Sequence, residues 1–206
     1  MVSENVMQRL HNAIQIYDDL VDKDYLIICS IGKKAEHKYY EISIQKQNFW
    51  HLLGCKLIKG NSQEIVYDLC LSGENIREFL EYTNNEKSCI KKDTVFNATF
   101  NFIKHAKQLK VCDVIDVPEE FQFKLASGNS SGYIGYDKYK DKKRLHYPKT
   151  TRTTPISETN FSEQKKILAI LSKPLNQNNY DCVEYEIAKD SYSDLRKNIP
   201  DEYEVL

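Results

Sequence analysis

The spacing of apolar residues changes near Val111, and this change constrains the fold more than any other feature of the chain. Before Val111, apolar residues recur at helical spacing, as they do after Ser3, whose side chain can cap a first helix. After Val111, apolar and polar residues alternate, which is typical of strands with one buried face. We therefore predict an α+β protein in which helices pack on an antiparallel sheet.

The predicted elements follow from this division. Residues 1–110 should be mainly helical apart from a hairpin near residues 24–46, and residues 117–190 should be mainly antiparallel strands. After the Ser3-capped helix, the predicted helices are Ser62–Leu71, Asn75–Tyr82 and Asp93–Lys110. The predicted strands are Tyr25–Ile31, Tyr40–Ile44, Tyr133–Tyr139, Leu145–Thr153 and Tyr180–Ile187. The apolar run Ile167–Leu171 can be assigned to neither type.

The chain length suits one domain. We predict a single domain over residues 1–190, followed by an acidic and loose tail over residues 191–206. No apolar run approaches the ~20 residues that span a bilayer, and the N-terminus lacks the basic and apolar segments of a signal peptide. We expect a cytoplasmic protein without a membrane partner.

Charge is sorted along the sequence although the net charge is only −1. Residues 87–110 hold six lysines against Asp93 alone, and residues 137–152 hold seven cations against two acids. After Tyr180 eight acids face three cations. This distribution predicts an anionic partner, such as RNA, for the basic segments.

Metal and cofactor chemistry have little support in the sequence. The six cysteines are scattered without a C-x-x-C pair, so we expect reduced, mostly buried thiols and no metal site. The chain has no G-x-x-x-x-G-K-[ST] loop, no H-E-x-x-H motif and no G-x-S-x-G motif. We expect no cofactor.

Two short motifs carry a family resemblance. Within residues 39–71 the run Phe49-Trp50-His51-Leu52-Leu53-Gly54 (FWHLLG) resembles the F-x-H-L-x-G signature of a phage and mobile-element family. That family is grouped with the barnase, EndoU, colicin and RelE nucleases (PBECR-type). The later run Tyr147-Pro148-Lys149-Thr150 (YPKT) is similar to its C-terminal strands. Over about residues 1–190, the resemblance implies a barnase/RelE-like ribonuclease fold and a metal-independent, nuclease-like function.

Metal-free RNA cleavage needs a base, an acid and cations that stabilise the phosphorane. The resemblance points to His51, although a buried structural histidine beside Trp50 is the alternative. His146 lies in the basic strand and is a candidate for the second proton-transfer group, or else a surface residue. Lys149 and Arg152 complete the predicted catalytic group as anion-binding cations.

A wider set of residues is predicted to bind nucleic acid. Cations would contact phosphates and tyrosines would stack on bases, unless this strand is only a solvated basic face. Strand alternation places Lys149 and Thr151 on one face and Thr150 and Arg152 on the other. The predicted nucleic-acid-binding residues are Lys138, Lys142, Lys143, Arg144, Tyr147, Thr150 and Thr151.

Two functional hypotheses remain open from the sequence. The first is a metal-independent endoribonuclease, an effector of a phage or mobile element. The second is a non-catalytic protein of the same fold whose basic face inhibits a host protein or defence nucleoprotein. An accessible His51 near Lys149 or Arg152 would favour the enzyme, and a His51 sealed beneath Trp50 would favour the binding protein.

Overall fold

The computed structural model describes residues 1–32, 36–114, 123–142, 144–159, 161–189 and 191–205. The α-helices are α1 (Glu4–Asp18), α2 (Phe49–Leu52), α3 (Gln63–Leu71), α4 (Glu86–Thr99) and α5 (Tyr192–Arg196). The strands are β1 (Lys23–Ser30), β2 (His37–Ile44), β3 (Cys55–Leu57), β4 (Leu80–Tyr82), β5 (Lys110–Asp113), β6 (Leu125–Asn129), β7 (Gly132–Lys138), β8 (Leu145–Arg152), β9 (Lys165–Pro174) and β10 (Cys182–Glu186). The 3-10 turns are η1 (Lys46–Asn48), η2 (Arg77–Phe79), η3 (Ile156–Glu158) and η4 (Asp201–Tyr203).

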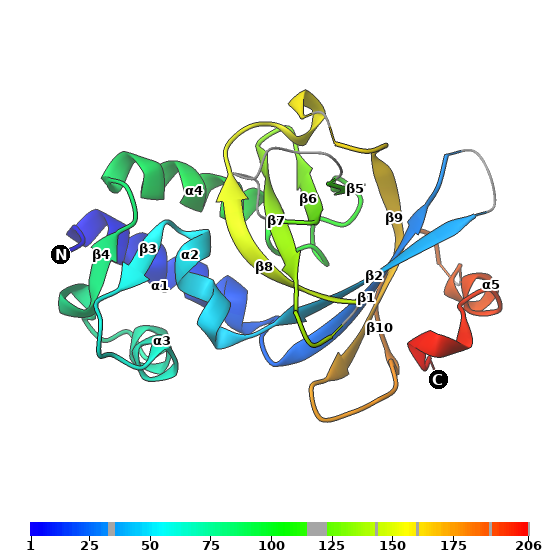
Figure 1. Ribbon diagram of the computed structural model, residues 1–206, viewed down its shortest axis with the longest axis horizontal. Coiled ribbons are helices and arrows are strands. Elements are labelled where there is room, and N and C mark those ends of the chain that lie inside the picture. Colours follow the sequence, from blue (N-terminus) through cyan, green and yellow to red (C-terminus); the bar gives the residue numbers. More distant parts are fainter. Residues whose placement is uncertain (33–35, 115–122, 143, 160, 190, 206) are drawn as a thin grey trace.

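The α+β prediction is confirmed. Helices α1–α4 gather on one side of a large, mostly antiparallel sheet, as Figure 1 shows. Ser3 caps α1 by accepting a hydrogen bond from the Val6 amide, and the helix buries its apolar face. The β1–β2 hairpin and the antiparallel β7–β8 pair also match the prediction.

The sheet closes on itself, which the sequence pattern did not indicate. Its strand order is β1-β2-β8-β7-β6-β5-β9-β10, and β1 also pairs with β9. The order therefore returns to its start through β9, and β10 lies outside this ring on the other edge of β9. One pair, β2–β8, is parallel. This pair joins the β1–β2 hairpin to the strands of the second half of the chain. Strand β8 therefore lies beside β2 and also near the helices.

Two helix predictions are wrong. The expected helix Asp93–Lys110 is α4, which starts earlier because Asn85 caps it by accepting from the Ser88 amide. It ends at Thr99, although the buried Phe100 and Phe102 continue the apolar pattern in turns. The expected helix Asn75–Tyr82 is η2 followed by β4, which pairs with β3. In both places apolar residues that are buried in turns or in a short strand had the spacing expected of a helix.

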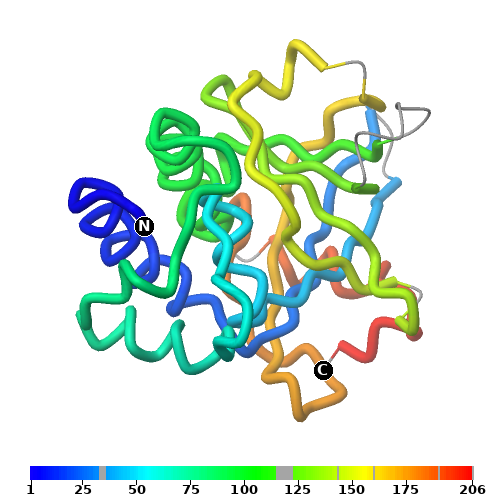
Figure 2. Tube along the Cα trace, turned by 60° about the vertical axis from the view of Figure 1, so that its left-hand side comes forward, coloured from blue at the N-terminus to red at the C-terminus, as the bar shows by residue number. Residues whose placement is uncertain are grey.

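The C-terminal segment also differs from the expected loose tail. It forms α5 and η4 and packs on the outer face of β1 and β9 (Figure 2). Tyr203 lies against Tyr39 with 5.0 Å between ring centroids, and the Tyr180 amide donates to the Glu204 carbonyl at 2.9 Å. Apolar tail residues pack it on the sheet, and the acidic Glu202 adds an ion pair with Arg144.

Buried aromatic residues fill the space between the helices and the sheet. Phe96 stacks on Phe100 at 4.5 Å, and Phe100 stacks on Tyr17 at 4.9 Å. The six cysteines are unpaired, and all except Cys182 are buried, as expected. No helix in the described part of the chain is both long and apolar enough to cross a membrane.

Candidate functional site

The FWHLLG motif buries its apolar residues and exposes its histidine. The Phe49 ring contacts the rings of Tyr17 and Trp50 at 5.1 and 5.0 Å, and Phe49, Trp50 and Leu52 are buried. These contacts anchor α2 in the core. His51 lies on the remaining side of this single helical turn and is exposed. It is therefore not sealed beneath Trp50.

Gly54 ends this segment and brings Lys92 of α4 over it. Its φ of +73° lies in the left-handed region that favours glycine. A Cβ at this position would lie 3.2 Å from Lys92 Cδ and 3.4 Å from Cys89 Sγ. The Lys92 stem therefore lies directly on the motif backbone, three residues from His51.

His51, Lys92 and Arg152, here called the His51 cluster, are linked by two electrostatic interactions, one between His51 and Lys92 and one between Lys92 and Arg152. The surrounding protein partly desolvates the His51 imidazole, and this desolvation and the charge of Lys92 lower the pKa of His51. Burial and the charge of Arg152 lower the pKa of Lys92. No carboxylate of the described residues contributes to either shift, and Asp93 is held by Arg9 of α1 at 2.7 Å. Lys92 of α4 thus interacts electrostatically with both His51 of α2 and Arg152 of β8, and two neighbouring cations favour binding of an anion.

Lys149, predicted to bind an anion, lies beside a carboxylate of the neighbouring strand β7. Its ammonium forms an ion pair with Asp137 at 2.7 Å. It is also the extra residue of a β-bulge, since Gly135 pairs with Thr150 and Tyr136 with Pro148. The regular alternation predicted over residues 149–152 is interrupted there. Lys149 is therefore a partly neutralised cation at the bulge.

Two of the other predicted binding residues, Tyr147 and Lys142, lie against the Tyr139 ring. Tyr147 packs on Tyr139 with centroids 4.8 Å apart, and the Lys142 ammonium lies 5.8 Å from the Tyr139 ring centroid. Thr150 is partly exposed, whereas Thr151 is buried. Lys143 lies outside the described residues.

His146 belongs to a different site. It lines a pocket of about 470 Å³ together with Lys138 and Arg144, and no residue of the His51 cluster lines this pocket. Burial lowers the pKa of His146. Arg152 lies six residues after His146, which corresponds to roughly 20 Å of extended strand. The predicted set of His51, His146, Lys149 and Arg152 is thus divided, with His51 and Arg152 in one cluster and His146 in the pocket.

Sequence reasoning missed Lys92 as a site residue. It was counted only within a basic segment, because nothing in the local sequence shows that its stem lies on Gly54. It also missed Asp113, which binds Lys38 and Lys165 beside the pocket. Within the described ranges, no three His, Cys, Asp or Glu side chains are placed to hold a metal ion.

The charge coupling in the His51 cluster can be tested by titration. We expect Lys92→Met to raise the pKa of His51 toward its ordinary value, because loss of a nearby positive charge favours the protonated imidazole. The measurement is an NMR titration of the His51 ring. Lys91→Met is the matched control, since Lys91 is the exposed neighbour on the same helix. An equal His51 pKa in both variants would contradict the coupling.

A comparison with known families agrees with this part of the chain. The model of a family described as phage-Barnase-EndoU-ColicinE5/D-RelE like nuclease 4 matches residues 9–189. The match includes the His51 cluster and the pocket-lining strands, and it ends before α5. No curated protein and no solved structure matches the chain.

Proposed function

Because the chain belongs to the phage-Barnase-EndoU-ColicinE5/D-RelE like nuclease 4 (PBECR4) family of phage nuclease-like domains, we propose that it is a metal-independent endoribonuclease. The observation that carries this proposal is the convergence of an exposed histidine with two cations at the FWHLLG motif. The helical layer beside the antiparallel strands supports the barnase/RelE-like arrangement that the resemblance implies.

The cluster can supply the groups that RNA cleavage needs. A lowered pKa keeps His51 neutral near pH 7, so that its imidazole can take the proton of a 2′-hydroxyl. The 2′-oxygen then attacks phosphorus, the bond to the 5′-oxygen breaks, and a 2′,3′-cyclic phosphate forms. Lys92 and Arg152 stabilise the charge of the phosphorane. Lys92, whose pKa is lowered, is the candidate donor of a proton to the leaving 5′-oxygen.

The substrate's 2′-hydroxyl provides the test. The protein should cleave single-stranded RNA in EDTA and leave 2′,3′-cyclic phosphate ends, whereas a 2′-O-methyl oligonucleotide of the same sequence should remain intact. Equal cleavage of both oligonucleotides would exclude attack by the 2′-oxygen. Cleavage that EDTA abolishes would exclude metal independence.

The binding hypothesis keeps one observation in its favour. The cluster contains a single histidine, and His146, the other candidate for proton transfer, lies in the pocket. A phage effector of this fold could therefore hold RNA, or inhibit a host nucleoprotein, through its cations alone. Salt-dependent RNA binding without any cleavage product would support this second function.

A further inference from the structure

The pocket lined by His146, here called the β2–β8 pocket, has the size of a small-ligand site. Its volume is about 470 Å³, within the range of roughly 300–1,000 Å³ typical of such sites. Its lining comes from β2, β5, β7, β8 and η4, together with Lys124 just before β6. Strands distant in sequence thus build one concavity.

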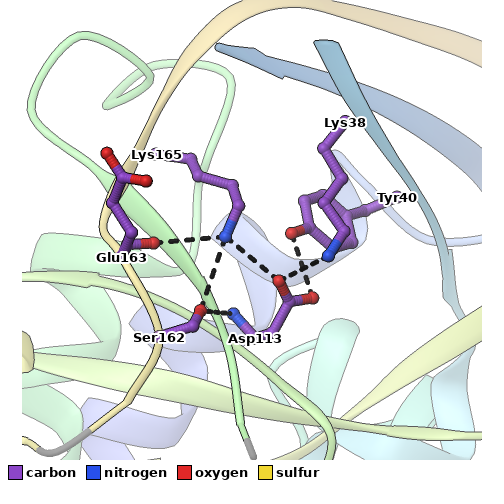
Figure 3. A network of polar contacts seen from close by, with 6 residues as sticks. All are labelled: Lys38, Tyr40, Asp113, Ser162, Glu163 and Lys165. Atoms are coloured by element: carbon purple, nitrogen blue, oxygen red, sulfur yellow. Dashed lines mark hydrogen bonds and ion pairs between the residues drawn. The ribbon is translucent and has the colours of Figure 1, made fainter. Parts of the chain in front are cut away.

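A saturated carboxylate forms one wall of the pocket. Asp113 Oδ2 accepts hydrogen bonds from Lys38 Nζ at 2.6 Å and from Lys165 Nζ at 3.0 Å. Its Oδ1 accepts from the Tyr40 hydroxyl at 3.1 Å, as Figure 3 shows. Burial alone would raise the pKa of Asp113, but the hydrogen bonds from the two lysines lower it. The carboxylate therefore stays ionised, and its two lysines leave a net positive charge.

The rim adds two further cations. Lys124 and Lys138 are exposed, and neither has a carboxylate partner within the described part of the chain. Arg144, by contrast, pairs with Glu41 at 3.3 Å and with Glu202 at 3.1 Å. Among the described residues that line the pocket, four are cations and two are carboxylates, so these residues carry a net charge of +2 with His146 neutral. The excess charge favours a dianion such as a phosphate monoester.

Aromatic rings stand beside this charge. Tyr39 of β2 and Tyr203 of η4 both line the pocket, with their ring centroids 5.0 Å apart. The Arg144 guanidinium lies 4.8 Å from the Tyr203 ring centroid and helps to hold that ring in place. Flat rings next to an anion site suit a ligand that joins a phosphate to a planar base.

We propose that the β2–β8 pocket binds a nucleotide, with its phosphate at Lys38, Lys124 and Lys138 and its base against Tyr39 and Tyr203. The ligand is either a free nucleotide or one nucleotide of an RNA strand. This site is separate from the His51 cluster, so that the proposal does not rest on RNA cleavage. Where RNA is the source, the pocket is a second contact for the substrate.

Calorimetric titrations of the full chain with AMP, adenosine and a non-cleavable 2′-O-methyl oligonucleotide test the proposal. The double variant Lys124→Gln/Lys138→Gln should weaken AMP binding on the order of tenfold, since two phosphate contacts are lost. Adenosine, which has no phosphate, should bind weakly in every variant. The matched control is Lys104→Gln/Lys107→Gln, which removes two exposed lysines that do not line the pocket.

The oligonucleotide separates the two sources of ligand. AMP binding that the oligonucleotide displaces indicates an RNA contact, and AMP binding that it leaves unchanged indicates a free nucleotide. His51→Ala should keep AMP affinity even if it loses cleavage, so failure of the two proposals can be told apart. Undetectable AMP binding to the unaltered protein, or equal affinity in the double variant and its control, would overturn the nucleotide site.

Discussion

Replacing His51 with alanine should reduce RNA cleavage by roughly 10²-fold or more, because a positioned general base contributes about this factor. The free energy of unfolding should change by less than about 1 kcal/mol, since exposed substitutions have small effects. The His51 ring makes no hydrogen bond to any residue that the structure describes, so its removal leaves no buried partner unsatisfied. Initial rates on a single-stranded RNA in EDTA and urea unfolding curves measure the two quantities.

The matched control is His105→Ala, which removes a partly exposed histidine outside the His51 cluster and the β2–β8 pocket. It should retain cleavage. The opposite pattern, in which His51→Ala melts several degrees lower and cleaves RNA at the rate of the unaltered protein, would make His51 a structural residue. Loss of activity in both variants would show that the assay reports folding rather than catalysis.

Local patterns predicted the elements that local interactions determine. Helix α1 has its own cap and an apolar face, and the β1–β2 hairpin has alternating residues and a short connection. The start of α4 was missed because Asn85 was not recognised as its cap. Ring closure was not predictable in the same way, because it depends on the β1–β9 and β2–β8 pairs, whose partners are more than 100 residues apart.

The same distinction applies to the candidate sites. The apolar neighbours of His51 indicated that its segment must pack in the core, and the exposure of the ring then follows from which sides of α2 are buried. Lys92 was missed because it meets the motif through a contact across Gly54. The division between His51 and His146 also escaped prediction, since residue type alone does not show which strand reaches which pocket.

The largest loss of stability should come from Asp113→Asn. Lys165 has a side chain only 6% exposed, and it depends on Asp113 for its counter-charge. Removing one partner of a buried ion pair costs roughly 3–5 kcal/mol, because the other charge stays buried and uncompensated. We expect the lower end of this range, since the Asp113 side chain is 21% exposed and water can screen the remaining charge. Urea unfolding at pH 7 measures the loss.

Two further variants identify Lys165 as the cause. Lys38→Met should cost no more than about 1 kcal/mol, because Lys38 is 43% exposed and its pair with Asp113 lies near the surface. Asp113→Asn/Lys165→Met should recover much of the loss of Asp113→Asn, since the buried charge is then absent. The pKa of Asp113 is lower in the folded protein than in the unfolded chain. The contribution of Asp113 to the free energy of unfolding is therefore present above the ordinary carboxyl pKa, and it is lost as the pH falls through the pKa of the folded state. The difference between Asp113→Asn and the unaltered protein should therefore shrink in acid. A double variant no more stable than Asp113→Asn would instead attribute the loss to the other hydrogen bonds of this carboxylate.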